Sequence, residues 1–191
     1  MQLILASASP RRKALLSLFH LPFTVRAADI DETMDSEKPP FDEVARVSRS
    51  KALAVGRGKE DIVIAADTIV VCQGKVLGKP HSEAEAASML RLLSGRDHQV
   101  MTGCTVLCGD RVETFTEVTS LHFRPLSDKE ILKYVQSGEP MDKAGSYGIQ
   151  GGAALFCEKL EGDYYNVMGL PVCRLYETLC RTAPEVMEDT L

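Results

Sequence analysis

The sequence predicts an α/β fold in which strands and capped helices follow one another along the chain. The main observation is an apolar run over residues 62–71, interrupted only by Asp67 and Thr68. A continuous run rich in β-branched residues is typical of a strand buried on both faces. Two long segments rich in Thr and Val, 99–108 and 111–123, predict a two-stranded antiparallel arm. The 191 residues suffice for one globular domain or two closely packed lobes.

Local signals predict the other elements. Ser9 and Pro10 begin the first helix as N-cap and first helical residue. Capping boxes at Ser82 and Ser127 begin two more helices, and Pro171 begins the last one. The other predicted strands cover residues 3–6, 23–25, 75–77 and 153–160. A further helix is predicted over 41–55, a turn over 163–166 and a frayed tail over 182–191.

Composition excludes several classes of protein. The net charge of −5 disfavours long-range attraction to nucleic acid or to an anionic membrane. No apolar run approaches the ~20 residues that span a bilayer, and we expect no signal peptide. The six cysteines form no CxxC pair and most lie in apolar surroundings, which indicates small buried thiols in a reducing cytosol rather than disulfides or a zinc site. We therefore expect a cytoplasmic protein with a small ligand.

Two charged residues lie in apolar surroundings. An ionised carboxylate at Asp67 is costly unless it is paired, hydrogen-bonded or bound to a metal. Lys51 lies on the same helix face as Val44, Val47 and Val55. Either this lysine snorkels along the apolar face to water, or its ammonium points inward at an anion. The pattern favours neither alternative.

The first helix turn contains an unusual cluster of cations. Arg11, Arg12 and Lys13 lie where the helix dipole favours negative charge. Together with Ser7, Ser9 and the free backbone N–H groups, they indicate a phosphate site. The alternative is a solvated basic turn.

Further polar residues lie in turns and loops beside predicted strands. An acidic turn covers 29–33, Lys79 lies in a Gly-Lys-Pro loop, and the glycine-rich segment 142–152 contains Gln150. That segment is either a binding loop or a plain mobile one. The candidate carboxylates and cations are Asp31, Glu32, Asp67, Asp142, Arg11, Arg12, Lys13, Lys51 and Lys79.

Carboxylates among lysines and arginines match the needs of metal-assisted phosphate chemistry. Carboxylate oxygens bind a hard cation such as Mg²⁺, which keeps several waters and binds phosphates. Lysine and arginine neutralise charge that develops on phosphoryl oxygens, and a carboxylate can orient a water or take its proton. The sequence has neither a GxxxxGK[ST] loop nor a GxSxG elbow.

These residues occur in motifs that resemble the Maf family. The match runs nearly end to end in one order and leaves only about the last ten residues outside it. The matching stretches are LASASPRR (5–12), DET (31–33), KA (51–52), ADT (66–68), GKP (78–80), LSG (93–95), DKAG (142–145), YGIQG (147–151) and GDYYNVMGLP (162–171).

The resemblance implies a nucleoside triphosphate pyrophosphatase, which cleaves the bond between the α- and β-phosphates to give a monophosphate and pyrophosphate. It implies an elongated mixed β-sheet with flanking helices in two lobes around a cleft, similar to the inosine triphosphatase fold. Members require a divalent cation, Mg²⁺ or Mn²⁺, and homodimers are common. The expected catalytic domain covers 1–181, followed by the tail 182–191.

The resemblance also assigns roles to residues. Asp67 matches the catalytic acceptor, and Glu32 with Asp67 would hold the metal. The ADT and YGIQG motifs resemble the dTTP/UTP-selective branch; a glutamine amide can pair with the O4 and N3–H edge shared by uracil and thymine. The expected catalytic residues are Asp67, Glu32, Lys51 and Lys79, and the expected substrate-binding residues are Ser7, Ser9, Arg11, Arg12, Thr68 and Gln150.

Three other functions compete with this one. The first is the same chemistry on 7-methyl-GTP or inosine triphosphate. The second is a nucleotide-binding regulator of cell division without catalysis, against which the complete set of charged site residues argues. The third is a nucleic-acid-binding module, which the acidic net charge and the lack of interleaved aromatic residues disfavour.

Overall fold

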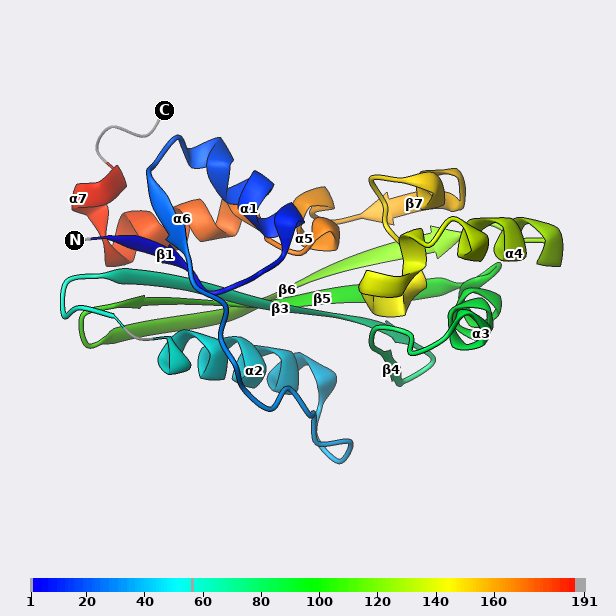
Figure 1. Cartoon of the computed structure of the whole chain (residues 1–191), viewed down its shortest axis with the longest axis horizontal. Helices are drawn as coiled ribbons and strands as arrows, with labels where there is room; N and C mark the ends of the chain where they lie inside the picture. Colours follow the sequence, from blue (N-terminus) through cyan, green and yellow to red (C-terminus); the bar gives the residue numbers. More distant parts are fainter. Residues whose placement is uncertain (1, 56, 188–191) are drawn as a thin grey trace. The chain divides into compact units, whose positions relative to one another are not determined.

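The computed structural model describes residues 2–55 and 57–187 (Figure 1). The strands are β1 (Leu3–Leu5), β2 (Phe23–Val25), β3 (Ile62–Cys72), β4 (Lys75–Leu77), β5 (Asp97–Cys108), β6 (Arg111–Phe123) and β7 (Cys157–Glu161). The α-helices are α1 (Pro10–Leu16), α2 (Pro40–Ala54), α3 (Glu83–Leu93), α4 (Asp128–Gln136), α5 (Tyr164–Met168), α6 (Val172–Thr182) and α7 (Pro184–Met187). Short 3₁₀ helices are η1 (Ser17–Phe19), η2 (Glu139–Asp142), η3 (Ala144–Ser146) and η4 (Gly152–Leu155).

The strands form one mixed sheet, which confirms the predicted α/β class. Within the described ranges its order is β2-β1-β3-β5-β6-β7, and β4 pairs with β3 outside this path. Strand β1 runs parallel to both neighbours, with Leu3 opposite Phe23 and Ile62. Strands β4 and β7 are antiparallel to their partners. The predicted run from residue 62 is β3, and it is buried along almost its whole length.

The chain divides into two compact units. Unit 1 contains the described residues within Met1–Asp67, Thr102–Glu117 and Gly169–Leu191. Unit 2 contains Thr68–Met101 and Val118–Met168. Strands β3, β5 and β6 therefore contribute residues to both units.

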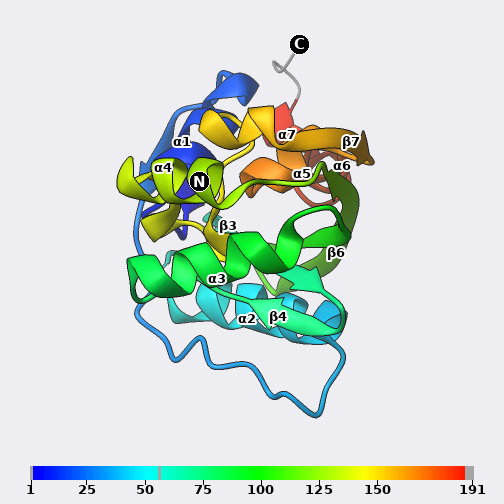
Figure 2. The same ribbon diagram turned by 90° about the vertical axis from the view of Figure 1, so that its right-hand side faces the viewer.

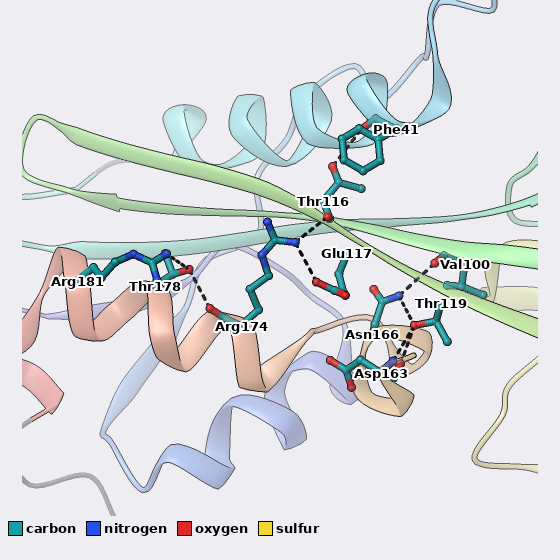
Figure 3. A network of polar contacts seen from close by, with 10 residues as sticks. All are labelled: Phe41, Val100, Thr116, Glu117, Thr119, Asp163, Asn166, Arg174, Thr178 and Arg181. Atoms are coloured by element: carbon teal, nitrogen blue, oxygen red, sulfur yellow. Dashed lines mark hydrogen bonds and ion pairs between the residues drawn. The ribbon is translucent and has the colours of Figure 1, made fainter. Parts of the chain in front are cut away.

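In unit 1, helix α2 packs on a polar seam of the sheet. The Ser48 hydroxyl lies 2.8 Å from that of Thr105, which lies 3.0 Å from the hydroxyl of Thr114. Thr116 donates a hydrogen bond of 3.0 Å to the Phe41 carbonyl (Figure 3). Beyond this seam the contact is apolar, formed by Ile4, Ala6, Ala52, Val55, Val63, Ala65 and Leu107. The short, hydrogen-bonded side chains let the helix lie close to the strands.

Helix α2 approaches the sheet closely at Gly103. A Cβ atom at this position would lie 2.3 Å from the carbonyl oxygen of Val44 and 2.8 Å from the backbone nitrogen of Ala45. Neither contact can be relieved by rotating a side chain, because both atoms belong to the helix backbone. Glycine is therefore required here by space.

We expect Gly103→Ala to destabilise the protein by ~1–3 kcal/mol, because overpacking must displace a helix. For a chain of this size the melting temperature would fall by about 2–12 °C. Gly78→Ala is the control, since no atom lies within 4 Å of its added Cβ. Equal melting temperatures for the two variants would contradict the close approach.

Helix α6 covers the other face of the unit 1 sheet (Figure 1). Arg174 donates to the carbonyl of Thr116 and pairs with Glu117, both at 3.0 Å (Figure 3). Its guanidinium carbon lies 4.6 Å from the centre of the Phe115 ring. Two layers of helix thus enclose β3 and β5 in this unit and keep water away from their side chains.

In unit 2, helices α3 and α4 pack against each other (Figure 2). Next to them is an aromatic cluster in which Phe123 makes edge contacts with His98, Tyr147 and Phe156. Burial lowers the pKa of His98 to about 4, so its ring is neutral at pH 7. The cluster is the apolar centre of this unit.

The turn expected over 163–166 is wrong, because helix α5 begins at Tyr164. The Asp163 carboxylate accepts the Tyr165 amide at 2.7 Å, in the manner of an N-cap. The Asn166 amide is buried and donates to the Val100 carbonyl at 3.1 Å and to Thr119 at 2.9 Å (Figure 3). These contacts between residues distant in sequence stabilise α5. The helix is too short to be predicted from its sequence pattern.

The strand expected over 153–160 is also wrong in its first half. Residues 152–155 form η4, closed by a hydrogen bond from the Phe156 amide to the Ala153 carbonyl, and β7 begins only at Cys157. The ring of Phe156 packs on Phe123 and Tyr134, so tertiary contacts decide between helix and strand here.

The helix caps agree with the sequence more closely. Ser9 and Ser82 cap their helices, and Ser127 forms a full capping box. The box at Ser82 is only half formed, because the Glu85 carboxylate accepts the amide of His81 instead.

At the other end of the chain, α7 follows α6, and Ala183 and Met187 are buried. Residues 188–191 of the expected tail lie outside the described residues.

The described residues also bear on two expectations from composition. None of their helices is both long and apolar enough to cross a bilayer. All six cysteines are free thiols, but the expectation that they are buried holds only for Cys72 and Cys104, because three others are half-buried and Cys173 is exposed.

Candidate active site

The centre of the candidate site is a lysine ammonium between two carboxylates in unit 1. Lys51 Nζ donates to Asp67 Oδ1 at 2.7 Å and lies 2.8 Å from Glu32 Oε2. The side chains of Lys51 and Asp67 are 10% and 12% exposed, whereas that of Glu32 is 54% exposed. Pairing satisfies two charges that would otherwise be costly to bury. Lys51 therefore points inward at anions, and the snorkelling alternative is wrong.

Three elements bring these groups together. Asp67 lies in the middle of β3, where both faces of the strand are covered. Lys51 lies on the buried face of α2, near the helix end and on the same side as Val44 and Val47. Glu32 comes from the connection between β2 and α2. Two expected catalytic residues thus lie on rigid elements and one on an irregular segment.

A second group of site residues surrounds the start of α1. The Arg12 guanidinium donates through Nε to the Gly169 carbonyl at 2.8 Å and through Nη1 to the Ser7 hydroxyl at 3.2 Å. Ser7 also accepts the Ser9 amide at 3.2 Å, and Ser9 accepts the Arg12 amide at 3.4 Å. The serines therefore shape the turn and hold the arginine. Lys13, in contrast, is exposed, while Arg11 is half-buried.

The charge of Arg12 interacts with the first group. Burial lowers the pKa of its guanidinium, and the Asp67 carboxylate acts in the opposite direction by stabilising the charged form. Arginine remains protonated throughout the working pH range in any case. The first turn is thus more than a solvated basic surface, because half-buried Arg12 is held by the Gly169 carbonyl and the Ser7 hydroxyl.

The remaining site residues belong to unit 2. Thr68 follows Asp67 in β3 and is half-buried, while Lys79 and Gln150 are exposed loop residues. The Gly78 carbonyl accepts the Gly145 amide at 3.0 Å, which joins the Lys79 loop to the glycine-rich segment. The structure therefore brings the loops of Lys79 and Gln150 into one assembly.

A carboxylate and a phenol organise the glycine-rich segment around Gln150. The Tyr134 hydroxyl donates to Glu139 Oε1 at 2.9 Å and accepts the Gly148 amide at 3.0 Å. Glu139 Oε2 accepts the amide of Gly152 at 3.0 Å. Burial raises the pKa of Tyr134, which keeps the donor protonated. The segment is therefore a loop held by hydrogen bonds to Tyr134 and Glu139 rather than a plain mobile loop.

Two candidate carboxylates serve other purposes. Asp31 accepts the Thr33 amide at 2.9 Å, as in a local turn, and hydrogen bonds from the Thr33 side chain, and next from its amide, lower the pKa of Asp31. Asp142 is exposed and pairs with its neighbour Lys143 at 2.7 Å. Neither of these contacts is to Lys51.

The sequence did not reveal three residues that hold the site residues in place. Gly169 contributes only its carbonyl, which no side-chain pattern can reveal. Glu43 and Arg46 lie on α2 ahead of Lys51 and hydrogen-bond the segment that contains Glu32. Their only signal was an acid and a base three residues apart on a helix.

Comparison with known proteins agrees with these motifs. A family model described as Maf-like protein matches residues 2–182. The chain is 53% identical over 178 residues to a dTTP/UTP pyrophosphatase of Halalkalibacterium halodurans, covering 93% of this chain and 94% of that protein. It is 51% identical over 174 residues to a dTTP/UTP pyrophosphatase of Geobacillus sp., covering 91% and 94%.

Among solved structures, a nucleoside-triphosphatase / dITP/XTP pyrophosphatase of Mycobacterium abscessus gives a TM-score of 0.43 at 13% identity, over 66% of this chain and 76% of that one. The family assignment rests instead on the family model and on relatives about half identical over nearly their whole length. On both grounds the chain belongs to the Maf family.

Proposed function

We propose that the protein is a metal-dependent nucleoside triphosphate pyrophosphatase that cleaves dTTP and UTP to the monophosphate and pyrophosphate. The observation that carries this proposal is the buried Asp67, paired with Lys51 beside Glu32. The names of the relatives, dTTP/UTP pyrophosphatase, supply the substrate class. Its role in the cell would be house-cleaning of the nucleotide pool.

Phosphate binding is assigned to the cations and serines of the site. Arg12 is held at two of its nitrogens, by the Gly169 carbonyl and the Ser7 hydroxyl, so its guanidinium has a fixed orientation. Ser7, Ser9 and Arg11 line the same turn, and Lys51 and Lys79 supply further positive charge. As pyrophosphate leaves, these cations neutralise the charge that develops on its oxygens.

Glu32 and Asp67 fit a divalent metal by their chemistry. Both lie against the Lys51 ammonium, so the two carboxylates are neighbours, and a divalent cation would bind beside that ammonium rather than at the point it occupies. Among the described residues, no three His, Cys, Asp or Glu side chains form a metal cluster. Mg²⁺ typically binds through one or two carboxylates plus substrate phosphates and waters, so two carboxylates suffice. The bound cation would supply charge neutralisation and a more acidic water.

Asp67 is assigned the central chemical role. Its carboxylate orients a water for in-line attack at the α-phosphorus and accepts the proton from it. Lys51 holds this carboxylate in one position through a hydrogen bond of 2.7 Å. Glu32, which is half exposed, completes the anionic side of the site.

Gln150 is assigned to base selection, together with Arg12 and Thr68. Its amide offers a donor and an acceptor, which match O4 and N3–H of uracil and thymine, whereas cytosine reverses this edge. Because Gln150 is exposed, a mispaired edge loses the net free energy of a hydrogen bond, ~0.5–1.5 kcal/mol, or about 2–12-fold in binding. We therefore expect dTTP and UTP to be preferred to CTP within that range.

A panel of nucleotides tests the reaction and its specificity together. Purified protein is incubated with dTTP, UTP, CTP, 7-methyl-GTP and inosine triphosphate, with Mg²⁺, with Mn²⁺ and with chelator. We expect dTTP and UTP to give the monophosphate and pyrophosphate, and we expect these products only when a divalent metal is present. A diphosphate with orthophosphate would contradict the cleavage site, preference for 7-methyl-GTP would move the protein to another branch, and binding without turnover would indicate a regulator.

The wider setting follows from the same proposal. We propose a single two-lobed catalytic domain over residues 1–181, acting in the cytoplasm on a small-molecule substrate, without nucleic acid or membrane and with homodimers permitted. The net charge of −5 supports the absence of a polyanionic partner.

A further inference from the structure

Glu32 lies on a segment that has little structure of its own. The connection between β2 and α2 covers residues 26–39 and contains neither helix nor strand (Figure 1). Most of its residues are exposed, and Glu32 is more than half exposed. Ordering such a backbone costs ~1–2 kcal/mol per residue. A half-exposed carboxylate held at Lys51 by a single ion pair therefore needs additional anchors.

Two hydrogen bonds supply anchors directly after Glu32. The carbonyl of Thr33 accepts Arg46 Nη2 at 2.8 Å, and the amide of Asp35 donates to Glu43 Oε2 at 2.8 Å. Both partners belong to α2, the helix that also contains Lys51. The backbone on one side of Glu32 is thus fixed to the same helix as the lysine that Glu32 contacts.

Glu43 and Arg46 form a rigid pair before they meet this segment. Arg46 Nε lies 2.9 and 3.1 Å from the two oxygens of Glu43, and Nη2 lies 2.8 Å from one of them. Glu43 is only 2% exposed, so its charge needs these partners. Hydrogen bonds from Arg46, and next from the Asp35 amide, lower the pKa of Glu43 to about 2. The pair is therefore charged and ordered at neutral pH.

Helix geometry links the pair to the site. Glu43 and Lys51 are eight residues apart on the buried face of α2, about 12 Å along the axis. Segment residues 33–35 bind near the helix start, and Glu32 binds Lys51 near its end. One helix thus sets the position of both the cation and the carboxylate.

We infer that Glu43 and Arg46 are positioning residues, which hold the backbone of 33–35 so that the Glu32 carboxylate stays beside Lys51 and Asp67. They act through Glu32 and make no contact of their own with substrate or metal. The consequence for metal use rests on the proposed function, whereas the ordering of the segment does not.

The test uses Glu43→Gln and Arg46→Lys. Glu43→Gln removes the negative charge of the carboxylate that accepts the hydrogen bonds of Arg46. Arg46→Lys keeps the positive charge but loses the planar guanidinium that donates to both Glu43 and Thr33. Asp42→Asn is the matched control, because Asp42 is an exposed acid in the same first helix turn. Residues that orient metal ligands typically cost 10–100-fold in metal affinity when changed. We expect the Mg²⁺ concentration for half-maximal dTTP hydrolysis to rise about 10–100-fold, with kcat largely recovered at saturating Mg²⁺.

A second readout does not require catalysis. Hydrogen exchange at the Asp35 amide should become faster in both variants and remain unchanged in Asp42→Asn. In a Glu32→Gln background, Glu43→Gln should add no further shift in metal requirement, because the two changes remove one interaction. Arg46, whose side chain is 43% exposed, provides a variant with less risk to folding than buried Glu43.

Each outcome distinguishes the two proposals. Faster exchange with an unchanged metal requirement, additive effects in the Glu32→Gln background, or a lower kcat without a shift in metal requirement would each overturn the positioning role. Unchanged exchange in both variants would overturn it as well. A wild-type protein inactive on every triphosphate would refute the proposed function alone, and the exchange data would then decide whether the pair orders the segment.

Discussion

Asp67→Asn is expected to reduce the turnover of dTTP by about 10²–10⁴-fold while the protein remains folded. A positioned general base contributes this much, and asparagine keeps the shape of the side chain but removes its charge and basicity. Folding should survive because Lys51 retains the Glu32 carboxylate at 2.8 Å, so the ammonium is not left unpaired. Pyrophosphate release under saturating Mg²⁺ and dTTP measures the effect, and thermal melting measures stability.

The control for this change is Asp61→Asn, at the residue directly before β3. That carboxylate accepts the amides of Gln2 and Gly58 at 3.0 and 2.7 Å, and it is not a site residue. The control should cost stability without lowering kcat. Full activity of Asp67→Asn would remove Asp67 from the mechanism.

Lys51→Met is expected to lower both stability and activity. Methionine retains much of the lysine stem but leaves two carboxylates without their cation, one of them in a site 8% exposed. Removing one partner of a buried ion pair costs ~3–5 kcal/mol. The melting temperature of a chain of this size should then fall by about 6–20 °C. Turnover should fall as well, since the lysine also neutralises phosphoryl charge.

The double variant Lys51→Met with Asp67→Asn separates the two effects. It removes the buried carboxylate charge together with its partner, so much of the lost stability should return. Turnover should be no higher than in Asp67→Asn, because both chemical roles are gone. If Lys51→Met melts and turns over dTTP like the wild type, the pair contributes to neither stability nor catalysis.

Much of the fold could be predicted from local signals. The β3 strand, the caps at Ser9 and Ser127, and the β5–β6 hairpin follow from apolar runs, capping residues and a Gly-Asp turn. Short elements could not be predicted in the same way. Helix α5 depends on Asn166 and Thr119, 47 residues apart, and η4 on the packing of Phe156. A pattern over four or five residues carries too little information to outweigh such contacts.

The candidate site could likewise be predicted only in part from the sequence. Its chemistry-bearing residue types were visible in the motifs, because a buried Asp and a cluster of cations are unusual wherever they occur. Which groups meet was not visible: Lys51 could have snorkelled, and Glu43, Arg46 and Gly169 gave little or no signal. Their roles depend on backbone carbonyls and amides that only the folded chain brings near them.

The sequence by itself determined the strand and helix order, the family, and the charged groups available for phosphate chemistry, because these depend on residue type and local spacing. Only the tertiary structure decided that Lys51 lies between Asp67 and Glu32, and that the segment of Glu32 is tied to α2. The physical reason is that the energy of a charge depends on its neighbours and its exposure to water, and folding alone sets both.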